Sequence, residues 1–140
     1  MAWDAGQGEE RHVMTINARA GATVAPYRIC KKGTDPDEVI VTTAGTDMPI
    51  GVSGNASENN AATYAEHDPI ALKVYGIVYV EMSGVGLRSD RVMPTASGKG
   101  LRHVNTDGVY VLGFAMEAWT DGQIIPVMID RFFVGDYTLS

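Results

Sequence analysis

The residue types that most often bind metals or act as nucleophiles are few in this chain and lie far apart. The histidines are His12, His67 and His103, and the single cysteine is Cys30. Local metal motifs place such ligands within a few residues of one another, and no two of these residues have that spacing. A catalytic cysteine is commonly activated by a histidine base, and no histidine neighbours Cys30 in the sequence. We therefore expect no metal site, and we predict that Cys30 is a packed side chain in a short strand.

Two further segments resemble ligand-binding loops but lack the residues that the chemistry requires. Ser97–Gly100 reads Ser-Gly-Lys-Gly, yet a phosphate loop needs an earlier glycine, and Gly100 stands where a hydroxyl would bind magnesium. The carboxylates of Asp35, Asp37 and Glu38 lack the glycine and closing glutamate of a calcium loop. Both segments are predicted to be turns. The sequence thus indicates no catalytic, cofactor-binding or metal-binding residues, and we expect that the protein is not an enzyme.

The composition favours a single β-rich domain. A chain of 140 residues can bury a substantial core, and its 16 glycines suit many short strands joined by turns. The net charge of −6 and the scattered lysines and arginines argue against binding to nucleic acid. One cysteine rules out an intramolecular disulfide, which suits a reducing cytosol. We expect no signal peptide and no membrane-spanning helix, because the strongly apolar runs are strand-length.

The longest alternating segment, Ile70–Met82, is predicted to be the central strand. Its even-numbered residues are apolar apart from Gly76, which predicts one buried face with a bulge or bend near the middle. Its odd-numbered residues include Tyr75 and Tyr79, together with a lysine and a glutamate. We interpret this mixed face as a candidate subunit contact.

Shorter alternating or apolar segments, bounded by glycine, proline and aspartate turns, predict the rest of an all-β barrel or sandwich. A polar stretch, Gly54–His67, is expected to be a long loop or to contain a short helix over residues 57–65. The further strands are expected at His12–Ala18, Tyr27–Lys31, Glu38–Thr43, Pro49–Ser53, Asp90–Pro94, Leu101–Val104, Val109–Met116 and Ile124–Val134.

The first twenty residues differ in character from the rest, so we predict an N-terminal arm over 1–20 and one β domain over 21–140. One interpretation is a frayed terminus. The other is an arm that becomes ordered on a partner, for example by adding a strand to the partner's sheet. Trp3 favours the second interpretation, because a solvated tail has little use for a tryptophan. Arg11 and His12 lie where this arm would meet the first strand.

Two parts of the chain resemble each other and predict an internal half-repeat. Pro49–Ser53 (Pro-Ile-Gly-Val-Ser) matches Val111–Ala115 (Val-Leu-Gly-Phe-Ala), and a long alternating strand follows each. The preceding segments, Thr43–Thr46 and Thr95–Gly98, look alike as well. The loop Gly54–His67 lengthens the first copy.

These residues give the chain a resemblance to the phage head decoration, or capsid cement, proteins. The matching segments span Tyr27–Ile129. They are Ile-Gly-Val-Ser at Ile50–Ser53, the strand and glycine turn at Ile70–Gly84, Gly-Phe-Ala-Met-Glu-Ala at Gly113–Ala118, Asp-Gly-Gln at Asp121–Gln123 and Ile-Pro-Val-Met-Ile at Ile125–Ile129.

The resemblance implies a barrel-like or β-tulip-like fold with a structural role and no catalytic residues. Such a protein is made in the host cytoplasm, binds the major capsid protein on the outer surface of the expanded phage head, and bridges neighbouring subunits. It would act as a homo-oligomer, with a trimer favoured and a dimer possible, and would bind neither nucleic acid nor membrane. The candidate contact residues are Trp3, Arg11, His12, Tyr75, Tyr79 and Trp119, although Trp119 also suits a core position.

Two other classes of protein remain open on the sequence alone. A small β-barrel that binds a ligand or a host surface would need Trp3, Trp119, Tyr75 and Tyr79 to converge on a concave site. A small enzyme would need histidines and carboxylates to be gathered from distant parts of the chain.

Overall fold

The computed structural model describes residues 11–55, 62–104 and 107–135, with only the backbone described for Arg11 and His12. Within these ranges the chain forms strands and turns and no helix, which confirms the all-β prediction. The strands are β1 (Arg11–Ala20), β2 (Ile29–Lys32), β3 (Glu38–Val41), β4 (Gly51–Val52), β5 (Pro69–Glu81), β6 (Arg91–Pro94), β7 (Gly100–Arg102), β8 (Val109–Ala115) and β9 (Ile124–Val134).

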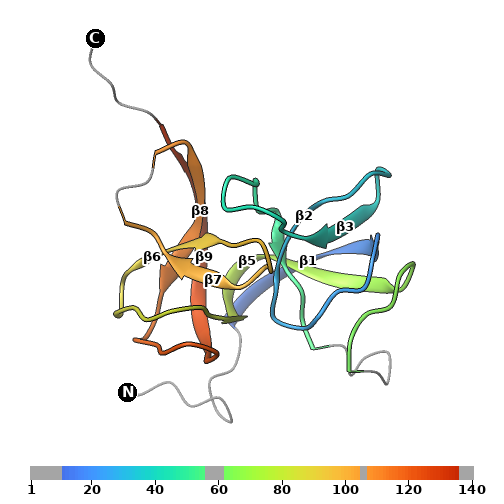
Figure 1. Ribbon diagram of the computed structural model, residues 1–140. Coiled ribbons are helices and arrows are strands. Elements are labelled where there is room, and N and C mark those ends of the chain that lie inside the picture. The colour runs from blue at the N-terminus through green and yellow to red at the C-terminus, as the bar shows by residue number, and fades with distance from the viewer. Residues whose placement is uncertain (1–10, 56–61, 105–106, 136–140) are drawn as a thin grey trace.

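The strands pair into one mixed sheet rather than a strict barrel. The order is β1-β3-β2-β4-β5-β9-β8-β6-β7, and the pairs are antiparallel except for β1 with β3. Because β1 also pairs with β5, the series from β1 to β5 closes on itself. Figure 1 shows the resulting arrangement, with β1–β4 on one side of β5 and β6–β9 on the other.

Strand β5 connects the two sides because its halves pair with different strands. Residues Pro69–Ile77 pair with β1, and Gly76–Glu81 pair with β9. Gly76 lies at this changeover with a φ of 101°, and the register of β1 against β5 shifts beside it. Only glycine adopts that φ without strain. The irregularity predicted near the middle of this strand is therefore present.

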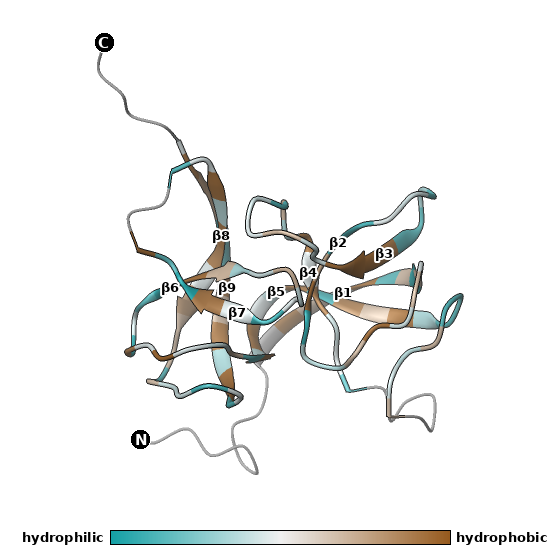
Figure 2. Cartoon of the chain, viewed as in Figure 1, coloured by the Kyte–Doolittle hydropathy of each residue, from teal (hydrophilic) through white to brown (hydrophobic). Residues whose placement is uncertain are grey.

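Two hydrophobic clusters fill the molecule, one on each side of β5. The first contains Ala20, Val24, Cys30, Val39, Tyr64, Ile70 and Leu72. The second is larger and contains Val78, Val80, Met82, Val92, Leu112, Trp119, Ile125 and Val127, together with Ile29 and Val52 from the other side. Figure 2 shows hydrophobic residues along strands such as β3 and β8, with hydrophilic ones at many of the turns.

The two segments that resemble each other in sequence also pair alike. Cys30 pairs with Gly51, and Val92 pairs with Gly113 in the same arrangement of β6 and β8. Val52 pairs with Lys73, as Phe114 pairs with Met128. We call β1–β4 with the first half of β5 the first unit, and the second half of β5 with β6–β9 the second unit.

The correspondence extends to the turns. An isolated bridge joins Val24 to Tyr64 in the first unit, and one joins Gly86 to Trp119 in the second. The amide of Ala20 donates to the carbonyl of Asp68, as the amide of Met82 donates to that of Gln123. Ala20 ends β1, and Met82 directly follows β5. The second half of β5 thus holds the place in the second unit that β1 holds in the first.

The register also locates the difference in length between the two units. Lys73 follows Val52 by 21 positions, whereas Met128 follows Phe114 by 14, so the extra residues lie in the loop Gly54–His67. The match of Thr43–Thr46 with Thr95–Gly98 is wrong. The first of these segments follows β3, whereas the second follows β6, whose counterpart is β2.

Candidate interaction surface

The predicted contact residues lie in different environments. Trp3 falls outside the described residues. Arg11 and His12 begin β1, where the backbone of Arg11 pairs with that of Ile77. The strand expected at His12–Ala18 is therefore present, and it pairs within this chain.

Trp119 lies in the core of the second unit. Its side chain is 3% exposed, and its indole Nε1 donates a hydrogen bond of 3.0 Å to the carbonyl of Ser83. Gly86 packs directly against the indole ring, because a Cβ at that position would come within 2.0 Å of a ring carbon of Trp119. This packing agrees with the core interpretation of Trp119, and Tyr64 is its buried counterpart in the first unit.

The mixed face of β5 is open to solvent mainly at Tyr75. That side chain is 59% exposed, whereas Tyr79 is half-buried. The carboxylate of Glu81 forms ion pairs of 3.1 Å with both Arg28 and Lys99. Glu81 therefore joins β5 to the neighbouring segments, which leaves Tyr75 as the prominent side chain of this face.

Tyr75 lines an open cleft of about 610 Å³, close to where β9 departs from β5. One wall comes from β5 and the segment before β4, and the other from β8 and β9. The lining residues are Met48, Pro49, Val74, Tyr75, Tyr110, Ile129, Asp130, Arg131, Phe132 and Phe133.

Polar and aromatic contacts hold the walls of this cleft. The guanidinium of Arg131 donates a hydrogen bond of 3.1 Å to the carbonyl of Pro49. The rings of Tyr110 and Phe133 meet with their centroids 4.9 Å apart. Exposed aromatic side chains, surrounded by polar groups that already have hydrogen-bond partners, suit contact with a protein or with the ring of a ligand.

The outer side of β9 continues this aromatic character. Phe132 stacks on Phe114 with ring centroids 6.0 Å apart, and the guanidinium of Arg91 lies 5.6 Å from the Phe132 ring centroid. The sequence analysis did not identify these residues. The available signal was the pair Phe132-Phe133, because adjacent residues of a strand point to opposite faces and both cannot be turned into one core.

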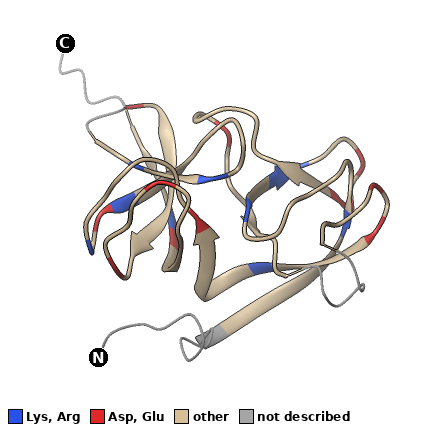
Figure 3. Cartoon of the chain, turned by 60° about the horizontal axis from the view of Figure 1, so that its bottom comes forward, with Lys and Arg blue, Asp and Glu red and all other residues tan. Residues whose placement is uncertain are grey.

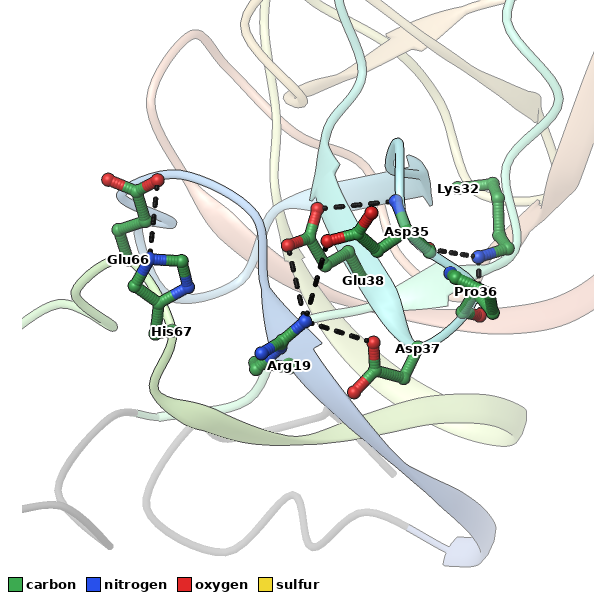
Figure 4. Close-up of polar contacts among 8 residues, drawn as sticks. All are labelled: Arg19, Lys32, Asp35, Pro36, Asp37, Glu38, Glu66 and His67. Carbon is green, nitrogen blue, oxygen red and sulfur yellow. Dashed lines mark hydrogen bonds and ion pairs between the residues drawn. The ribbon is translucent and has the colours of Figure 1, made fainter.

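A polar cluster at the other end of the molecule explains the acidic turn before β3. Arg19 approaches the carboxylates of Asp35 at 3.6 Å, Asp37 at 3.2 Å and Glu38 at 3.4 Å (Figure 4). Asp35 and Asp37 are exposed turn charges, whereas Glu38 is buried. These carboxylates thus fasten β1 to β3. In the view of Figure 3, charges of both signs are spread over both units.

Cys30 is fully buried, as its strand position predicted. Burial raises the pKa of its thiol to about 12, although hydrogen bonds with Ser53 partly offset this rise. The thiol is therefore neutral at physiological pH. Among the residues that the structure describes, no three His, Cys, Asp or Glu side chains gather as metal ligands, and no helix is long and apolar enough to cross a membrane.

Comparison with solved structures finds a similar fold in a phage protein. The N base of the head fiber protein gp8.5 of bacteriophage phi29 matches with a TM-score of 0.62 and 18% sequence identity. The match covers 84% of this chain and 94% of the phi29 chain. At that identity, it shows a shared fold. No protein-family model and no curated protein matches the sequence.

Proposed function

We propose that this protein is a structural component of a phage virion that decorates the outer surface of the head. It binds the major capsid protein as a homo-oligomer, bridges neighbouring capsid subunits and braces the expanded shell against packaged DNA. The observation that carries the proposal is the fold shared with the base of a phage head fiber over most of both chains. The resemblance of its sequence segments to head decoration proteins points the same way.

The surface suits a protein partner. Large apolar side chains are exposed at several places, among them Met14, Tyr75, Met48 and Phe133. A bridging protein needs more than one contact surface, and these residues come from both units. Many modest contacts repeated by the symmetry of a shell give strong total binding through avidity.

Sedimentation with purified heads tests the proposal. We expect the protein to co-sediment with expanded heads and to raise the temperature at which they release DNA. Tyr75→Ala should weaken binding by about tenfold, because a truncated aromatic anchor commonly costs 1 kcal/mol or more. Val85→Ala, which truncates an exposed side chain away from the cleft, is the matched control.

Heads that stay bare, or that gain no thermal resistance, would overturn the decoration role. If Tyr75→Ala binds heads normally, the decoration role is retained, but the cleft is not part of the surface that contacts the capsid.

A second candidate is a host-adhesion module that binds a ligand in the cleft. Trp119 does not line such a site, because it is buried, and Trp3 falls outside the described part of the chain. The observation in its favour is the aromatic lining of the cleft, to which Tyr75, Tyr110 and Phe133 contribute. Saturation-transfer NMR with host-surface glycans would detect this activity, and Tyr75→Ala should abolish the signal.

A further inference from the structure

Three strands hold corresponding positions in the repeated architecture. The β1–β5 pairing places Ile16 opposite Leu72, and the β5–β9 pairing places Val78 opposite Val127, in matching register. Ile16 and Val78 therefore hold the same position by register. Because β5 itself corresponds to β9, with Lys73 matching Met128, counting along both strands from that match places Phe133 level with Val78.

The side chain at this position is buried in β5 and exposed in β1 and β9. Val78 is 0% exposed, whereas Ile16 is 44% and Phe133 is 53% exposed. Val78 belongs to a cluster that combines the second unit with Ile29 and Val52 of the first. Val78 is therefore buried where both units meet. Ile16 and Phe133 are exposed at the two ends of the molecule, where no further unit follows.

The second unit carries its own counterparts of these covering residues. By register, Ile29 corresponds to Arg91 and Val52 to Phe114. Phe114 is half-buried, and both residues contact the ring of Phe132. In the second unit the positions that correspond to Ile29 and Val52 are therefore only partly covered, and they carry an arginine and a phenylalanine in place of two aliphatic side chains.

Both outer faces expose large apolar side chains, with charged residues such as Arg91 beside them, whereas the end units of repeat proteins carry polar caps that keep them soluble. Met14, on the same strand as Ile16, is also exposed. We propose that copies of this chain associate head to tail. The β1 face of one copy, Met14 and Ile16, packs on the β9 end of the next, Phe114, Phe132 and Phe133. This contact deepens the proposed function, on whose homo-oligomer it rests, by naming the two surfaces that meet, and it does not depend on a capsid partner.

A second copy is the favoured occupant because Ile29 and Val52 already share a core with Val78 inside one chain, and the proposed contact would place Phe114 and Ile16 in the corresponding positions. A head-to-tail contact joins two different patches, so it either closes into a ring or continues as a filament. In both forms every internal copy uses both faces.

Light scattering of the purified full chain tests the contact. We expect the wild type to form species larger than the 15.0 kDa monomer. Ile16→Lys and Phe133→Lys should each weaken association at least about tenfold, because a buried lysine without a partner is strongly unfavourable. Val85→Lys, a lysine placed on an exposed aliphatic position outside both faces, should associate like the wild type. Thermal unfolding of each variant would establish that it is folded.

Mixing the two variants distinguishes a head-to-tail contact from a symmetric one. Ile16→Lys retains the β9 end and Phe133→Lys retains the β1 face, so an equimolar mixture should form a dimer containing one of each and stop there. A mixture that remains monomeric overturns the proposal, as does either variant that still dimerises alone.

The other possible occupants give different results. A wild-type monomer that begins to associate when residues 1–10 are deleted would show that the chain covers its own β1 face. A wild-type monomer whose binding to heads is lost in Ile16→Lys would assign that face to the capsid protein. Either result overturns self-association, and the second supports the decoration role.

Discussion

At the scale of single residues, two glycines set the distance between the short and long strands of each unit. A Cβ on Gly51 would lie 2.6 Å from the carbonyl oxygen of Lys73, and one on Gly113 would lie 1.8 Å from that of Met128. The sequence analysis matched these glycines by pattern but could not supply the reason. Close approach of a backbone carbonyl depends on strand pairing between distant parts of the chain.

Gly113→Ala should therefore destabilise the protein by more than about 3 kcal/mol, because strands β8 and β9 must separate to admit the methyl group. Urea unfolding followed by circular dichroism measures the change. Gly135→Ala is the control, since a Cβ at that position meets no atom closer than 4.0 Å. Equal stability of the two variants would show that the backbone yields easily at Gly113.

At the scale of elements, alternation and turn residues were sufficient to locate the strands but not their partners. Ile124–Val134 was predicted at its observed bounds, and Ile70–Met82 differs from β5 by one residue at each end. Periodicity reports which face of a strand is buried, and it carries no information on the neighbouring strand. The pairing of β1 with both β3 and β5 accordingly came only from the structure.

The charge cluster that fastens β1 to β3 should contribute modestly and in a salt-dependent way. Arg19→Ala leaves three carboxylates without their shared cation, so we expect a loss of about 1 kcal/mol at low ionic strength and less in 0.5 M salt. Urea midpoints at the two salt concentrations measure it. The exposed Arg88→Ala serves as control, and a loss independent of salt would indicate packing by the arginine stem instead.

At the scale of the whole molecule, the described residues form two similar units that share strand β5. The sequence showed the similarity of the units, and the shared role of β5 emerged only from its pairing with β1 and β9. The candidate surface was predicted in part. Tyr75 was identified, but the aromatic residues of β8 and β9 were not, because their apolar character alone does not distinguish core from surface.

Sharing a strand should make the two units unfold together. Cys30 reports on the first unit, because its thiol is buried and its pKa is raised to about 12, so it reacts with a thiol reagent only after unfolding. Trp119 fluorescence reports on the second unit when Trp3→Phe removes the other tryptophan. We expect one urea midpoint for both probes. Two separated midpoints would show that the units are independent.

The shared strand also determines how the molecule carries tension. The thirteen residues of β5 form one continuous covalent connection between the two units, with the irregularity at Gly76 between its halves. Pulling the two units apart along β5 loads the hydrogen bonds to β1 and β9 in shear, so many must break at once rather than one after another. A tether of this kind would stretch little before it failed, which would suit the proposed role on a shell under internal pressure.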